Sequence, residues 1–308
     1  MKIDGLFDLQ AMMFLLMAVG VILRKRNIIT AEGKTILTDL VINLILPCNI
    51  ISAFYIPMDG SVFLAEAEIL VISILIQIFC TCISSLLYRK VPREKKMVLQ
   101  YATVCSNAGF LGNPVAEGLY GSMGLLYASV YLIPQRIVMW SAGVSYFTEC
   151  PSRKEVVKKV LRHPCIVAVE IGIILMLTQV RLPEFLSSSI ENVGGCTTAV
   201  TMILIGTILT EADMKKMLTR ITLAYSFIRL VFIPVVVFAG CYLAKVDAVV
   251  AGVSVTLAAM PAGTTTAILA VKYHGDEEFA TQCVVLTTVL SVIAIPIWSL
   301  VIHHVFLP

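Results

Sequence analysis

Ten apolar segments, each about as long as a membrane-crossing helix, run through this chain. They lie at about residues 6–23, 35–55, 62–88, 97–118, 122–147, 164–180, 187–210, 219–244, 247–271 and 277–306. A helix needs roughly 20 apolar residues to cross the hydrocarbon core of a bilayer. Only 14% of the residues are charged, whereas soluble domains average about 25%. The pattern therefore predicts an all-α transmembrane protein, since a membrane barrel would show ~10-residue alternating strands.

Basic residues are distributed unevenly among the loops between these segments. Of the 23 lysines and arginines, 18 lie in alternate loops, three (Lys2, Arg181 and Lys245) lie in the others, and two (Arg136 and Arg229) lie within segments. Cytoplasmic loops carry an excess of Lys and Arg. The distribution therefore predicts ten spans with both termini outside. We place them in a bacterial inner membrane.

An internal repeat divides the chain into two five-helix units. We expect a first repeat at 1–149, a cytoplasmic linker at 150–163 and a second repeat at 164–308. An odd number of spans per unit inverts the second unit in the membrane, as in many transporters. At an offset of 154 residues, SNAGFLGNPVAEGLYG (106–121) aligns with MPAGTTTAILAVKYHG (260–275), matching at Ala-Gly and at the final Gly.

These two paired segments, the fourth and the ninth, carry helix-breaking and polar residues at membrane depth. Their members are Asn107, Gly109, Asn113 and Pro114 in the first, and Pro261, Gly263, Thr264 and Thr265 in the second. Proline removes a backbone donor and glycine leaves helical angles at little cost. In lipid the freed backbone groups must find partners or line a wet cavity. We interpret both segments as broken helices whose amides would face an anion and whose carbonyls would face a cation.

A plain proline kink with small residues packed between helices is the alternative. That interpretation suits the isolated prolines Pro47, Pro134, Pro234 and Pro296. The pairing of the two segments at half the chain length favours broken helices for them.

At these residues the sequence resembles the auxin efflux carrier family. The most specific stretches are SNAGFLGNP (106–114) and MPAGTTTAILAVKYHGD (260–276), with LPCNIISAF (46–54) and TTVLSVIAIPIW (287–298) in support. The resemblance covers nearly the whole chain. One departure is the seventh segment, which reads GGCTTAVTMILIG (194–206) without the proline that the family pattern leads us to expect.

The resemblance implies a fold shared with bile-acid symporters, in which helices 4 and 9 break and cross near the membrane midplane. Helices 1, 2, 6 and 7 would form a scaffold, and helices 3–5 and 8–10 a transport domain that moves like an elevator. Asn107 and Pro114 would lie on the first crossing segment, and Pro261, Gly263 and Thr264 on the second. Family substrates such as malate, malonate and auxin-like acids are all carboxylates.

Charged residues inside apolar segments usually face a cavity or a partner. The fork of Arg136 suits a substrate carboxylate; alternatively, its side chain snorkels or pairs with Glu117. For Arg229, near the cytoplasmic end of its segment, we expect snorkelling. Glu117 is a candidate for a coupling proton, or it lies in water at the outer mouth.

The leading functional hypothesis is a secondary active transporter of small organic anions. The chain has no G-x-x-x-x-G-K-[ST] loop, so ATP is not expected to drive it directly. Proton coupling, sodium coupling and uniport stay open. A channel or sensor for small anions is an alternative, and an intramembrane enzyme is disfavoured because H-E-x-x-H and paired intramembrane aspartates are missing.

The chain is expected to need no cofactor and to hold no metal. Its nine cysteines lie mostly within apolar segments, and its four histidines do not cluster in the sequence. The expected partners are the anion, the lipid bilayer and, through the scaffold, a second copy in a homodimer. Nucleic acid is not an expected partner.

Overall fold

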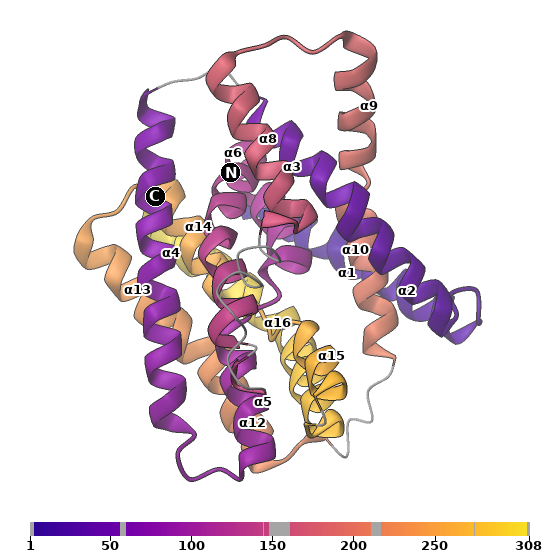
Figure 1. The fold of residues 1–308 in the computed structure, drawn as a ribbon, viewed down its shortest axis with the longest axis vertical. Coiled ribbons are helices and arrows are strands. Elements are labelled where there is room, and N and C mark those ends of the chain that lie inside the picture. Colours follow the sequence, from indigo (N-terminus) through magenta and orange to yellow (C-terminus); the bar gives the residue numbers. More distant parts are fainter. Residues whose placement is uncertain are drawn as a thin grey trace.

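The protein is described by a computed structural model over residues 3–55, 60–143, 145–147, 161–210, 217–273 and 275–306. Within these residues the chain is helical, and a single antiparallel bridge, between Ser106 and Ala262, is its one β contact. The predicted linker at 150–163 lies mostly outside the described residues. Figure 1 shows the helices as a bundle with α4 running along one side.

The first half of the chain, where the first repeat is predicted, contains nine helical elements within the described residues. They are α1 (Ile3–Lys25), α2 (Ala31–Leu40), η1 (Val41–Ile45), α3 (Leu46–Phe54), α4 (Gly60–Leu87), α5 (Arg93–Val104), η2 (Ala108–Gly112), α6 (Asn113–Val138) and η3 (Met139–Gly143). The element α6 contains a sharp turn at Gly121, whose φ of 68° is readily adopted only by glycine. This turn separates the fourth predicted span from the fifth.

The second half contains the remaining elements. They are α8 (Pro164–Thr178), α9 (Glu184–Gly195), α10 (Thr197–Leu209), α12 (Arg220–Phe227), η4 (Ile228–Phe232), α13 (Ile233–Ala244), α14 (Ala248–Ala258), α15 (Thr265–Lys272) and α16 (Glu277–Phe306). Among the described residues, five continuous helical stretches are long and apolar enough to cross a membrane, and α8 and α14 are shorter apolar helices. The all-helical class is confirmed. The count of ten spans, the inverted repeat and the outside termini stay predictions.

Three π-helical segments each end at the same distance before a proline. The segments η1, η2 and η4 each end two residues before a proline, at Pro47, Pro114 and Pro234. A proline lacks the N–H group that an α-helix needs and clashes with the carbonyl four residues earlier. A local π-bulge absorbs this mismatch without ending the helix. At Pro47 and Pro234 the helical path therefore continues through a π-helical segment.

The helices pack in two groups. The first group contains α1, α2, α3, α8, α9 and α10, and its closest packing pairs α1 with α10 and α3 with α8 and α9. The second group contains α4, α5, α6 and α12 to α16, within which α4 packs on α6 and α14 packs on both α6 and α16. Contacts between the groups are sparser. In Figure 1, α2, α9 and α10 of the first group lie to the right and end well above the loops at the base of the second group.

Glycines bring helices of the first group into backbone contact. A Cβ added at Gly20 of α1 would lie 2.0 Å from the carbonyl oxygen of Ile203, and one at Gly206 of α10 would lie 2.0 Å from that of Met17. Gly194 packs in the same way against the backbone of α3 at Asn49, and Gly172 packs against the Phe54 side chain. Such small-residue contacts let helix backbones approach closely. They hold the first group together as one tightly packed unit.

Candidate functional site

The two broken segments meet and run antiparallel at the centre of the second group. The Asn107 N–H donates to the Pro261 carbonyl at 2.8 Å, and the Gly263 N–H donates to the Cys105 carbonyl at 2.9 Å. Helix α5 ends just before this crossing, and helix α14 ends just before its partner segment. Both segments predicted to break therefore do break, and each supplies the backbone bonds that the other has lost.

Side chains from two further helices hold the crossing in place. Gln135 of α6 donates to the Ser106 carbonyl at 2.8 Å and accepts from the Ser106 hydroxyl at 3.0 Å. On the other segment, the Ala262 N–H donates to the Thr287 hydroxyl of α16 at 3.1 Å. Sequence reasoning missed Gln135 and Thr287. The available signal for Gln135 was a buried amide directly after the intrahelical Pro134.

A cavity of about 390 Å³ lies between the two helix groups and reaches the crossing. Asn107 and Thr264 contribute to its wall, so one predicted site residue from each broken segment faces the same space. Its remaining lining comes from α2, α10, α15 and α16 and from η1 and η2: Lys34, Thr35, Thr38, Asp39, Ile42, Phe110, Leu204, Ile205, Ile208, Ala267, Thr281, Val284 and Val285. The volume is within the range of ligand pockets, roughly 300–1,000 Å³.

The electrostatics of this cavity come from helix ends and two side chains. Segment η2, which leads into α6, begins directly after Asn107, and α15 begins directly after Thr264. The positive N-terminal ends of two half-helices therefore lie at the cavity wall. Lys34, half-buried, and Asp39, exposed, add one charge of each sign from α2.

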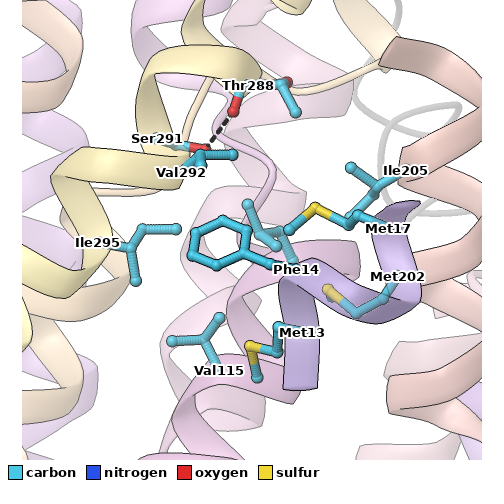
Figure 2. A pocket seen from close by; sticks show the side chains of 11 residues that line it. Met13, Phe14, Met17, Val115, Met202, Ile205, Thr288, Ser291, Val292 and Ile295 are labelled. Carbon is cyan, nitrogen blue, oxygen red and sulfur yellow. Dashed lines mark hydrogen bonds between the residues drawn. The ribbon is translucent and has the colours of Figure 1, made fainter. Parts of the chain in front are cut away.

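Apolar side chains fill the space beyond the cavity. Figure 2 shows Phe14 and Met17 of α1 pointing toward Ile295 and Val292 of α16. The gap left between them measures only about 20 Å³, and Ile205 lines both this gap and the larger cavity. The cavity is lined instead by the start of α2, the end of α10 and the start of α16. It therefore lies toward the ends that carry the basic loops.

Three other predicted residues lie on the opposite side of the first broken segment. Gly109, Asn113 and Arg136 line a space of about 10 Å³ between α3, α6 and α8. A Cβ added at Gly109 would lie 2.7 Å from Arg136 Nη2, so the guanidinium packs closely against this glycine. Arg136 Nε and Asn113 Oδ1 are both buried without a hydrogen-bond partner in the described part of the chain. The structure thus separates Arg136 from the larger cavity.

Glu117 lies at a contact between the two helix groups. Its Oε2 accepts a hydrogen bond of 3.0 Å from Asn49 Nδ2 of α3, and Asn49 is buried. Across the described residues, Glu117 forms no ion pair with Arg136, so the pairing considered from the sequence does not occur. Thr265 accepts a hydrogen bond from the Tyr101 hydroxyl at 3.2 Å, which places it beside α5. Pro114 is buried at the start of α6, next to Asn113.

Arg229 lies at the crossing of the two broken segments, a position that the sequence did not indicate. Its side chain is only 3% exposed, so the expectation that it snorkels is wrong. Its Nε donates to the Met260 carbonyl at 2.8 Å, Nη2 to Ala258 at 3.1 Å and Nη1 to Thr103 at 3.3 Å. The guanidinium therefore joins the ends of both broken helices. Because Arg229 lies inside the π-helical segment η4, its direction departs from that of a regular helix.

His163 caps the start of α8 and lies close enough to Arg136 for its charge to act on the imidazole. Its Nδ1 accepts from the Cys165 N–H at 3.3 Å. Burial lowers the pKa of His163 to about 3, and the positive charge of Arg136 acts in the same direction. The imidazole is therefore neutral at physiological pH.

The polar groups at the crossing are amides, hydroxyls, carbonyls and the guanidinium of Arg229. Among the described residues, no three His, Cys, Asp or Glu side chains gather in a way that would ligate a metal. The chemistry available at the cavity is therefore hydrogen bonding and charge attraction toward a ligand.

The chain matches known proteins over nearly its full length. A family described as "Membrane transport protein" matches residues 8–299. A protein of Methanothermobacter thermautotrophicus described as an uncharacterized transporter is 26% identical over 295 residues, covering 93% of this chain and 95% of that protein. A second protein of the same description, from Methanocaldococcus jannaschii, is 23% identical over 308 residues, covering 95% and 97%.

Proposed function

The chain belongs to the membrane transport protein family as a multi-pass membrane protein, and from that premise we propose that it is a secondary transporter of small carboxylates. The family match confirms the resemblance to auxin efflux carriers. The observation that carries the proposal is the antiparallel crossing at Asn107 and Pro261, which opens onto a cavity of about 390 Å³. Paired broken helices with a site at their crossing are a recurrent device of alternating-access carriers.

The charge at the cavity supports an anionic substrate. The N-terminal ends of two half-helices and Lys34 lie at its wall. Helix N-termini bind carboxylates and phosphates because their free N–H groups and dipole favour negative charge. We propose that Asn107 and Thr264 donate hydrogen bonds that orient a carboxylate there. The Asn107 side chain has no hydrogen-bond partner within the described residues, so its amide is available.

We propose that the two helix groups are the scaffold and the transport domain of an elevator. The crossing lies wholly within the second group, and the cavity lies between the groups. Much of their contact beyond the cavity is apolar, with side chains such as Phe14 and Ile295 lining a small gap between the groups. With the basic loops on the cytoplasmic side, this arrangement is an inward-facing state in the cell membrane.

Glu117 is our proposed coupling residue. Its hydrogen bond to Asn49 joins the second group to the first. An elevator movement must break this contact, and protonation of the carboxylate changes how strongly the amide holds it. A proton could therefore be linked to the movement of the transport domain.

Uptake into proteoliposomes tests the proposed function. We would measure entry of labelled malonate and malate with the wild-type chain, with Asn107→Ala, and with Ser188→Ala as a control on the exposed face of α9. The expected result is saturable carboxylate uptake by the wild type and the control, with strong loss in Asn107→Ala. Uptake equal to that of empty liposomes for a panel of mono- and dicarboxylates would refute the substrate class.

A further inference from the structure

The crossing leaves one carbonyl of α5 without its helical partner. In a continuous helix the Thr103 carbonyl would accept from the N–H of Asn107, four residues later. That N–H instead donates across the crossing to Pro261. The freed Thr103 carbonyl accepts from Arg229 Nη1 at 3.3 Å.

The end of α14 shows the same exchange of hydrogen-bond partners. The Ala258 carbonyl would accept from the Ala262 N–H in a continuous helix, but that N–H donates to Thr287 of α16. Arg229 Nη2 donates to Ala258 at 3.1 Å, and its Nε donates to Met260 at 2.8 Å. One guanidinium thus satisfies carbonyls freed on both broken segments.

The charge of Arg229 is balanced by these carbonyls. The side chain is 3% exposed, and no carboxylate in the described part of the chain pairs with it. A helix C-terminus carries roughly half a negative elementary charge. The two ends of α5 and α14 together therefore match about one positive charge. The planar fork of arginine reaches both ends at once, which a compact ammonium group does less well.

In other transporters, unwound carbonyls and the C-terminal ends of half-helices coordinate a coupling cation. We propose that Arg229 is a built-in counter-cation of the crossing, which occupies the place of a coupling metal ion. No sodium ion then binds at these carbonyls. The negative helix ends are covered, and the positive ends at Asn107 and Thr264 are left to face the anion. The statement that the positive helix ends face the anion rests on the proposed function, whereas the role of Arg229 does not.

Thermal unfolding of the purified protein tests this proposal without a transport substrate. Midpoints would be compared in sodium chloride and choline chloride at equal ionic strength, for the wild type, Arg229→Ala, Arg229→Lys and Arg220→Ala. Arg220 is an exposed arginine at the start of α12 and serves as the matched control. Wild type and control are expected to show midpoints in the two salts within about 1 °C of each other.

Arg229→Ala is expected to unfold at a lower temperature in choline and to regain about 2 °C or more in sodium or in millimolar guanidinium. Arg229→Lys keeps a charge at this place and is expected to show no sodium response. A saturable sodium stabilisation of the wild type would overturn the proposal, as would an Arg229→Ala variant as stable as the control. If Arg229→Ala does not fold, the sodium responses of the wild type and of Arg229→Lys still test the proposal. A chain that moved no carboxylate would refute the proposed function and leave these results unchanged.

Discussion

The two faces of the first broken segment differ sharply, although they are built from one short stretch of sequence. Asn107 faces a cavity of about 390 Å³ shared with Thr264. Gly109, only two residues later, packs against the guanidinium of Arg136 in a space of about 10 Å³. The first space has room for a small organic anion, and the second holds roughly one water molecule.

This difference shows that a polar motif at membrane depth serves two tasks at once. Its cavity face has polar groups available to a ligand. Its packed face, with Asn113 and Glu117 one helical turn apart on α6, contacts the first helix group through Asn49. We expect substitutions on the cavity face to change substrate affinity and those on the packed face to change stability or coupling.

Asn107→Ala is expected to have the largest effect on uptake. Losing one hydrogen bond to a charged ligand costs about 1.5–3 kcal/mol, which corresponds to roughly 10- to 100-fold in affinity. The measurement is the concentration dependence of carboxylate uptake in proteoliposomes, with membrane insertion checked by the yield of folded protein. Wild-type affinity in this variant would remove the distinction between the two faces.

Glu117→Gln is expected to affect coupling more than affinity. A glutamine oxygen still accepts from Asn49 but carries no proton at any working pH. Uptake by the wild type is expected to depend on pH more strongly than uptake by the variant. Glu184→Gln, at the exposed start of α9, is the matched control. A variant that keeps the wild-type pH profile would exclude Glu117 as the coupling group.

Much of this arrangement could be predicted from the sequence because helix breaks have local causes. Glycine, proline and asparagine at membrane depth identified both broken segments, and the family resemblance implied their crossing. Asn107 and Thr264 both immediately precede a half-helix, and the structure places both at one cavity. These features depend on backbone chemistry within a few residues.

The roles of the two intramembrane arginines could not be predicted from local sequence patterns. Each is a single charge in an apolar segment, and which one reaches the crossing depends on the rotation of its helix. The π-helical segment η4 adds a residue to the turn that carries Arg229 and so changes its direction. Gln135 poses the same problem, because its role depends on Ser106, 29 positions away. The local sequence pattern does not determine such tertiary contacts.

Arg136→Gln tests the packed face of the first broken segment against its cavity face. Because Arg136 packs on Gly109 outside the larger cavity, carboxylate affinity is expected to change by less than about threefold. Loss of its packing is expected to lower the unfolding midpoint by about 2–4 °C, the shift that ~1 kcal/mol produces in a chain of this size. Arg162→Gln, an exposed arginine nearby in the sequence, is the control. A tenfold loss of affinity would instead make Arg136 a substrate ligand.

His163→Gln is expected to have the smallest effect, confined to stability at acidic pH. Burial lowers the pKa of His163 from its ordinary value of 6.5 to about 3. Between these values the unfolded chain binds a proton that the folded chain does not, so the free energy of unfolding falls as the pH drops through this window. The glutamine variant lacks this contribution, and its unfolding midpoint is expected to fall less between about pH 6.5 and 4. An identical pH dependence in both proteins would show that His163 is not held neutral beside Arg136, and that this end of the packed face is open to water.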